Sequence, residues 1–305
     1  MKSAASKTRR LLKIRKHACA ESGLWVTEFD YRGVASAAFC PVRAARQSSP
    51  VPADEVVPRV LDELNRMSRR PPAWVWMNPF ADAFVPGAED LADTTLTLMP
   101  ALLSRDVGVT LRTRGGLPGA RALVTLARRF PKHLRIEVAF FTADRPLHRQ
   151  WEVGAASVRD RLELLQALKR AGVEVVARVG PVVPMVNDAE DQITQLLRTL
   201  AAHGVDEVAL SWVADRPGLR AQIGREVSAS KARVLGGFFS MDGGLRRDQE
   251  LPDQVKRVRS ARFEAAAQPL GLGLLRCRCS HTGSASCVRG PGAIPDRQLG
   301  LFSNA

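Results

Sequence analysis

Residues 24–42, which read LWVTEFDYRGVASAAFCPV, decide the fold of this chain. The segment from Leu24 to Phe29 is rich in β-branched and aromatic residues, and this composition predicts a strand. Gly33 follows soon after, and a glycine at the exit of a strand lets the backbone turn sharply above a sheet. We therefore expect a first strand that is followed by a loop lying over the end of the sheet.

Strand-like and helix-like segments alternate along most of the chain. Apolar strands are expected at residues 24–29, 73–77, 107–111, 134–141, 173–179 and 205–213. Helical spacing of apolar residues occurs at 53–67, 91–104, 118–130, 157–171 and 188–202. Apolar strands that alternate with amphipathic helices pair in parallel and are covered by those helices. This periodicity fits a partial (β/α)6 barrel and, nearly as well, a doubly wound open sheet.

The strand followed by Tyr31-Arg32-Gly33 resembles the start of the radical S-adenosylmethionine (SAM) enzymes, in their spore photoproduct lyase-like branch. Later segments are similar to motifs of that family in the same order, at residues 78–82, 112–114, 150–165, 179–188 and 262–272. The resemblance implies an α/β fold, namely a partial (β/α)6 TIM-type barrel with an irregular C-terminal extension.

The resemblance also implies a [4Fe–4S] cluster that binds SAM, held by a Cys-x3-Cys-x2-Cys motif directly after the glycine. The three matching positions here are Val34, Ala38 and Pro41, while Cys40 lies one residue out of register. Aliphatic side chains cannot ligate iron, because the cluster is held by thiolates. We expect this degenerate loop to have lost the usual cluster and, with it, the main anchor for SAM.

Polar side chains lie where several predicted strands end, namely Asp82, Arg112, Arg114, Arg178 and Asn187. In parallel α/β folds the loops at these ends carry binding and chemistry. Three arginines at one barrel mouth predict a site for an anion such as a phosphate or a carboxylate. The alternative is that they are rim charges solvated by water.

The tail carries two separate motifs. Cys277, Cys279, His281 and Cys287 have the ligand number and softness of a tetrahedral zinc site. The alternatives are thiols without a metal, or an iron–sulfur cluster that Cys40 joins.

The second motif is the pentapeptide Gln298-Leu299-Gly300-Leu301-Phe302, which matches the bacterial sliding-clamp-binding peptide. In an extended tail, Leu301 and Phe302 are suited to an apolar pocket while Gln298 hydrogen-bonds at its entrance. The alternative is that the peptide docks on its own barrel.

The composition of the chain indicates a class of partner and a cellular compartment. The formal net charge is +14, which favours an anionic partner such as DNA. Five cysteines without a recognisable secretory signal, and no apolar run of membrane-spanning length, predict a cytoplasmic protein. Basic residues before the tail are expected either along DNA or on a solvated helix face: Arg246, Arg247, Lys256, Arg257, Arg259 and Arg262.

The expected organisation is a basic N-terminal extension at residues 1–20, a barrel at 21–235, a helical segment at 236–275 and a Cys/His-containing tail at 276–305. Three functions follow from these observations. The first is a DNA-associated binding or scaffold protein tethered to the sliding clamp. The second is an active radical SAM lyase-like enzyme with unrecognised cluster ligands, and the third is a zinc-containing nucleic-acid-binding protein.

Overall fold

A computed structural model of the chain describes residues 10–17, 20–27, 37–40, 51–67, 71–77, 81–239 and 249–275. None of the helices in these ranges is long and apolar enough to span a membrane.

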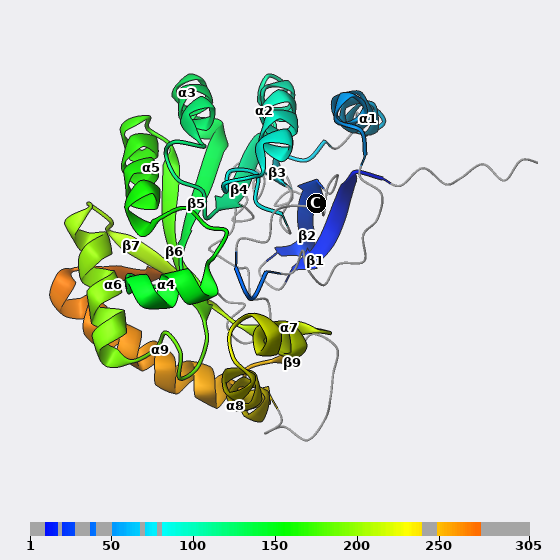
Figure 1. Ribbon diagram of the computed structural model, residues 1–305. Helices are drawn as coiled ribbons and strands as arrows, with labels where there is room; N and C mark the ends of the chain where they lie inside the picture. Colours follow the sequence, from blue (N-terminus) through cyan, green and yellow to red (C-terminus); the bar gives the residue numbers. More distant parts are fainter. Residues whose placement is uncertain are drawn as a thin grey trace, which may run out of the picture.

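A sheet of parallel strands forms the centre of the molecule (Figure 1). Its strands are neighbours in chain order: β2 (Ala20–Thr27), β3 (Trp74–Met77), β4 (Gly108–Thr113), β5 (Leu134–Phe140), β6 (Glu174–Val182) and β7 (Glu207–Trp212). Each pair from β2 to β7 is parallel. The predicted succession of six parallel strands is therefore confirmed.

Two strands that the sequence did not predict extend this sheet to eight. β1 (Leu12–His17) pairs antiparallel with β2 at one edge, and β10 (Gly273–Leu275) pairs parallel with β7 at the other. A separate small sheet joins β8 (Ala214–Asp215) to β9 (Gln249–Glu250). The segment predicted as an N-terminal extension thus contributes an edge strand.

Helices in chain order follow the arc of the sheet in Figure 1: α1 (Ala53–Asn65), α2 (Glu89–Leu103), α3 (Arg121–Arg129), α5 (Val158–Arg170) and α6 (Glu190–Ala202). Their positions match the five predicted helices to within a few residues. The described chain also has α4 (Arg145–Trp151), α7 (Leu219–Glu226), α8 (Ala229–Phe239) and α9 (Asp253–Ala267), with short 3-10 turns at Pro131–His133 and Gln268–Leu270.

The two faces of the sheet differ in chemistry because side chains alternate along each strand. The outer face packs against the helices through apolar residues such as Val75, Val109 and Val138, which share one core with helical residues such as Leu98 and Leu165. The residues between them in sequence point to the opposite, inner face, and several of these are polar or charged. An inner face of this kind suits a site rather than a second apolar core.

Candidate functional site

Three charged side chains form a cluster on the inner face. Glu137 on β5 lies opposite Arg112 on β4, and its Oε2 accepts hydrogen bonds from Nε of Arg112 at 2.7 Å and from Nε of Arg178, on β6, at 2.8 Å. Glu137 and Arg178 are each only 1% exposed. Burial acts to raise the pKa of Glu137, but the two guanidinium groups hold this pKa below its ordinary value. We call Arg112, Glu137 and Arg178 the inner-face cluster.

A second charged cluster lies at the carboxyl end of β4. Glu152 is fully buried and accepts two hydrogen bonds from Arg161 at 2.9 and 3.0 Å, and one from Nε of Arg114 at 3.0 Å. Arg114 also donates to the carbonyl of Gly180 at 3.0 Å. His148 lies one helical turn before Glu152, with its Nε2 3.7 Å from Oε2 of Glu152. We call Arg114, His148, Glu152 and Arg161 the mouth cluster.

Capping residues hold the two helices that carry this mouth cluster. Asp144 accepts a hydrogen bond from the N–H of Leu147 at the start of α4, and Ser157 accepts one from the N–H of Asp160 at the start of α5. Asp and Ser are favoured at these positions because their side chains satisfy helix N–H groups that have no partner within the helix. The short α4 is thereby fixed so that Trp151 and Glu152 turn inward.

Asp82 shapes the loop after β3 rather than facing an open mouth. Its carboxylate accepts hydrogen bonds from the hydroxyl of Thr113 at 2.7 Å and from the N–H groups of Phe84 and Arg114. Burial raises the pKa of Asp82, although these hydrogen bonds act in the opposite direction. The residue therefore ties the loop after β3 to the end of β4.

Asn187 also makes backbone contacts within the barrel mouth. Its Oδ1 accepts from the N–H of Val183 at 2.7 Å, and its Nδ2 donates to the carbonyls of Phe141 at 2.9 Å and Pro181 at 3.1 Å. These bonds join the end of β5 to the loop after β6. In the described residues, each of the five predicted mouth side chains is thus engaged by protein atoms, and anion binding by them stays a prediction.

Aromatic rings join the described part of the first loop to the end of β5 and to α4. The ring of Phe39 lies 5.2 Å from that of Phe141, which in turn stacks at 5.5 Å on Trp151. The guanidinium of Arg114 lies 5.0 Å from the centre of the Phe39 ring. Ala38 is buried beside these rings, and its N–H donates to the carbonyl of Trp151 at 2.8 Å. We call Phe39, Phe141 and Trp151 the aromatic cluster.

Residues that follow the last barrel strand in sequence hold the same loop. Nη2 of Arg216 donates to the carbonyl of Cys40 at 2.7 Å and to that of Phe39 at 3.2 Å. Gln222, on α7, accepts from Arg216 at 2.9 Å and donates to the carbonyl of Cys40 at 3.4 Å. These contacts fix the backbone of the loop against the last third of the chain.

The described part of the first loop does not fit a three-thiolate cluster. Ala38 has no ligating atom, and Cys40 is the single cysteine among the described residues, where it is buried. In the same ranges, His, Cys, Asp and Glu side chains form no group of three or more that could hold a metal ion. Val34 and Pro41 lie outside the described residues.

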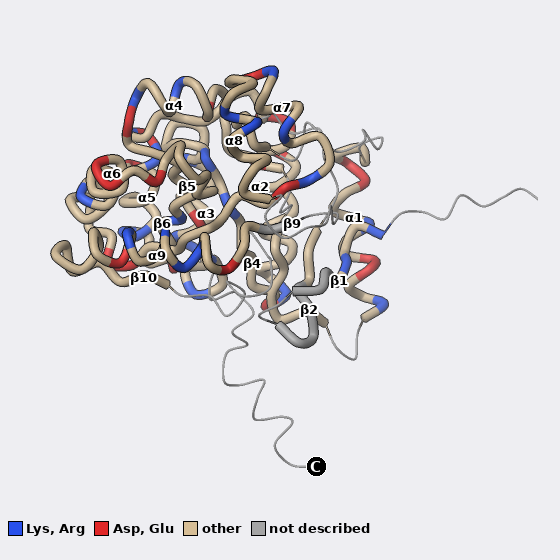
Figure 2. Tube along the Cα trace, turned by 90° about the horizontal axis from the view of Figure 1, so that it is seen from below, with Lys and Arg blue, Asp and Glu red and all other residues tan. Residues whose placement is uncertain are grey.

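The tail motifs also lie outside the described residues. This applies to the zinc ligands Cys277, Cys279, His281 and Cys287, and to the clamp-like peptide with Gln298, Leu299, Leu301 and Phe302. Of the basic residues before the tail, Lys256 pairs with Asp253 at 2.9 Å and Arg259 pairs with Asp188, whereas Arg257 and Arg262 are exposed. Figure 2 shows Lys and Arg interspersed with Asp and Glu along the helices.

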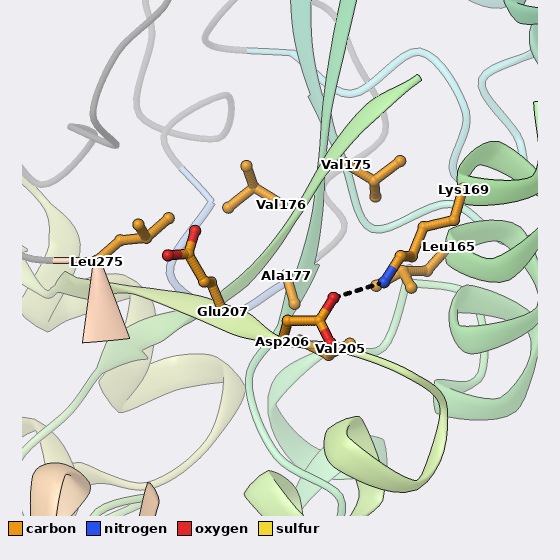
Figure 3. Close-up of a pocket in the computed structure, with 9 residues that line it drawn as sticks. All are labelled: Leu165, Lys169, Val175, Val176, Ala177, Val205, Asp206, Glu207 and Leu275. Atoms are coloured by element: carbon orange, nitrogen blue, oxygen red, sulfur yellow. Dashed lines mark hydrogen bonds and ion pairs between the residues drawn. The ribbon is translucent and has the colours of Figure 1, made fainter. Parts of the chain in front are cut away.

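A cavity of about 210 Å³ lies away from the mouth, at the amino ends of β6 and β7 beside β10 (Figure 3). Val175, Val176 and Leu275 give it apolar walls. At its rim, Nζ of Lys169 pairs with Asp206 at 3.0 Å. None of the residues that line this cavity belongs to the inner-face cluster or to the mouth cluster.

Sequence reasoning missed the carboxylates that organise the site. Glu137 sits inside the apolar strand LRIEVAF, and a charged residue there was a usable signal, because a buried charge requires a partner. Glu152 and Arg161 lay within a segment that carried the family resemblance, but their mutual contact depends on how α4 and α5 meet. Phe39 gave no signal before the loop could be placed.

Comparisons with known proteins agree with this architecture. No model of a known protein family matches the sequence. A stretch of 125 residues is 29% identical to uncharacterized proteins of Mycobacterium bovis and Mycobacterium tuberculosis, covering 39% of this chain. The match spans only 36% of the length of those relatives.

Solved structures of spore photoproduct lyase have the same fold. The enzyme complexed with dinucleoside spore photoproduct superposes with a TM-score of 0.62 at 14% identity, covering 87% of this chain and 79% of that one. A variant with bound AdoMet and dinucleoside spore photoproduct gives a TM-score of 0.57 at 14% identity, covering 74% and 66%. The chain therefore shares the fold of these spore photoproduct lyase structures, with a mostly parallel sheet that helices cover.

Proposed function

We propose that this chain is a binding protein built on the radical SAM-like fold, and that it has lost the cluster held by the first loop. The packing of the first loop against the aromatic cluster is the observation that carries this proposal. Ala38 occupies a ligand position of the family motif, yet it is packed beside Phe39, Phe141 and Trp151, and Arg216 holds the loop backbone from the other side. A loop packed in this way against aromatic side chains is suited to a structural role rather than to iron ligation.

Anaerobic reconstitution with iron and sulfide tests this proposal. We expect the wild-type chain to stay colourless, with iron well below one cluster per chain and no reductive cleavage of SAM. A brown protein that cleaves SAM would overturn the proposal and establish the alternative, an active radical SAM enzyme. In that case Cys40→Ser and the double variant Cys277→Ser, Cys279→Ser would assign the cluster to the loop or to the tail, since only the liganding set loses iron.

We also propose that the chain associates with DNA. Its net charge of +14 and the exposed Arg257 and Arg262 on α9 support an interaction with phosphates. One of the spore photoproduct lyase structures that share the fold is complexed with dinucleoside spore photoproduct. The alternative is a zinc-containing nucleic-acid-binding protein whose metal is held by the tail. Metal analysis separates the two hypotheses: zinc in the wild type that is lost in the Cys277→Ser, Cys279→Ser variant supports the alternative.

The tail peptide supports tethering to the sliding clamp. The sequence from Gln298 to Phe302 supplies two apolar anchors and one polar entrance residue. Purified clamp should be retained by the wild-type chain but not by the Leu301→Ala, Phe302→Ala double variant. Equal retention of clamp by both proteins would contradict tethering, and a Ser303→Ala variant serves as the control for an altered tail.

A further inference from the structure

Two buried polar atoms on the inner face have no hydrogen-bond partner among the described residues. They are Nε1 of Trp76 on β3 and Oγ1 of Thr110 on β4. The two residues are directly paired in the ladder between these strands, so their side chains lie next to each other on one face. Trp76 is 6% exposed and Thr110 is fully buried.

The chemistry of these atoms indicates what they lack. An indole N–H can only donate a hydrogen bond, whereas a threonine hydroxyl can donate or accept. A buried donor without a partner costs about 1–3 kcal/mol, so such groups are rare unless a ligand, ion or water supplies the acceptor. The missing partner of Trp76 must therefore carry a hydrogen-bond acceptor.

Neighbouring charge favours a negatively charged acceptor. The guanidinium of Arg112 lies 5.1 Å from the centre of the Trp76 ring, and Arg112 is two residues after Thr110 on the same face of β4. Arg178 lies close by, because it bonds the same carboxylate, Glu137, as Arg112 does. Positive groups in a water-poor interior strengthen the binding of oxyanions, and guanidinium groups match carboxylate and phosphate geometry.

We propose that Trp76, Thr110 and Arg112 form the donor side of a binding site, inside the half-barrel, for the oxyanion group of a small molecule. The group is a phosphate or a carboxylate. The site is distinct from the mouth cluster, with which it shares no residue, and Arg112 keeps its hydrogen bond to Glu137 within it. It requires no iron or SAM, so its test is independent of the reconstitution experiment.

Isothermal titration of the full-length protein tests the site with two probes, sodium phosphate and sodium succinate, at constant ionic strength set with sodium chloride. Saturable binding of phosphate assigns a phosphorylated ligand, and saturable binding of succinate assigns a carboxylate. Thr110→Val keeps the side-chain shape and Trp76→Phe keeps an aromatic ring, while each removes the donor, and each should weaken binding of the assigned probe about tenfold. Thr95→Val is the matched control, because Thr95 on α2 also has a buried hydroxyl without a described partner and should bind the probe as the wild type does.

The proposal is overturned if neither probe binds, or if Trp76→Phe and Thr110→Val bind the probe as tightly as the wild type. It is also overturned if Thr95→Val weakens binding as much as they do, since the anion would then respond to general changes in the protein. The melting temperature of each variant shows whether it is folded. Thr110→Val removes a hydroxyl that lacks a partner and should leave the melting temperature of the ligand-free protein unchanged or raised, whereas the smaller ring of Trp76→Phe should lower it. If Trp76→Phe does not fold, Thr110→Val alone decides the outcome, because Val and Thr have nearly the same shape.

Discussion

At Gly180 both the backbone conformation and the neighbouring atoms exclude a side chain. Its φ of +143° lies in a region that other residues rarely adopt, and an added Cβ would lie 2.3 Å from Oγ and 2.5 Å from the carbonyl oxygen of Ser211. Gly180→Ala should lower the free energy of unfolding by about 2–4 kcal/mol, because both the backbone and Ser211 would have to shift. Urea denaturation measures this change.

Gly237 is the matched control for that substitution. It lies in α8, where an added Cβ meets no atom within 4 Å. Gly237→Ala should be neutral or should stabilise the protein by up to about 1 kcal/mol, since alanine favours a helix more than glycine does. A similar loss of stability in both variants would contradict the tight packing described around Gly180.

His148 makes stability depend on pH. Burial lowers its pKa below the ordinary 6.5, with Glu152 opposing and Arg161 adding to the shift. In the unfolded chain His148 therefore takes up a proton at higher pH than in the folded chain. Its contribution to stability is complete above pH 6.5 and is lost as the pH falls toward the lower, folded pKa. His148→Gln should flatten the pH dependence of the melting temperature below about pH 6.5, and an unchanged profile would exclude this role.

At the scale of elements, the inner-face cluster links three neighbouring strands. Glu137 on β5 bonds Arg112 on β4 and Arg178 on β6, and all of these bonds are largely shielded from water. Glu137→Gln would leave two buried guanidinium groups without their shared carboxylate, at a cost of about 3–5 kcal/mol in the free energy of unfolding.

The control for Glu137 is an exposed ion pair. Glu163 on α5 pairs with Arg159 one turn away at 2.9 Å, with the Arg159 side chain 86% exposed. Glu163→Gln should change stability by less than about 0.5 kcal/mol, because water screens the pair. Chemical denaturation should therefore show a loss in the free energy of unfolding that is several-fold larger for Glu137→Gln than for Glu163→Gln. Equal losses would contradict the buried cluster.

The spacing of apolar residues predicted the helices and strands that pack in the regular repeat of the fold. The six parallel strands are short apolar runs, and five helices carry a regular apolar stripe, so both follow from local pattern. β1 was missed because its sequence, LKIRKH, is basic and pairs on one edge only. α4 was missed because it has only seven residues and depends on the Asp144 cap and on burial of Trp151. These features are set by tertiary contacts that a single segment does not encode.

The site was less predictable than the fold for the same reason. Arg112, Arg114 and Arg178 could be placed near the strand ends from sequence, but their partners Glu137 and Glu152 lie 25 and 38 residues away for the first two. Sequence distance gives no register between strands. Which arginine meets which carboxylate therefore required the sheet itself.

At the scale of the whole molecule, charge should govern any association with DNA. The exposed Arg257 and Arg262 lie on α9, and Arg128 and Arg129 are also exposed, on α3. If α9 contacts DNA, the Arg257→Ala, Arg262→Ala variant should reduce the slope of log affinity against log salt by about 2, whereas the Arg128→Ala, Arg129→Ala variant should not. Fluorescence anisotropy with a labelled duplex measures both slopes, and equal slopes would place the contact elsewhere.

The hydrogen bond from Arg216 to the carbonyl of Cys40 spans 176 positions of the chain. Contacts of such long range form late, since the intervening polypeptide must first be ordered before their closure becomes favourable. A ribosome-bound nascent chain that ends before residue 216 should therefore expose Phe39 and Phe141 to a hydrophobic dye, and release of the finished polypeptide should abolish that signal. We therefore expect residues 37–40 to be among the earliest to be synthesised and among the last to reach their final place.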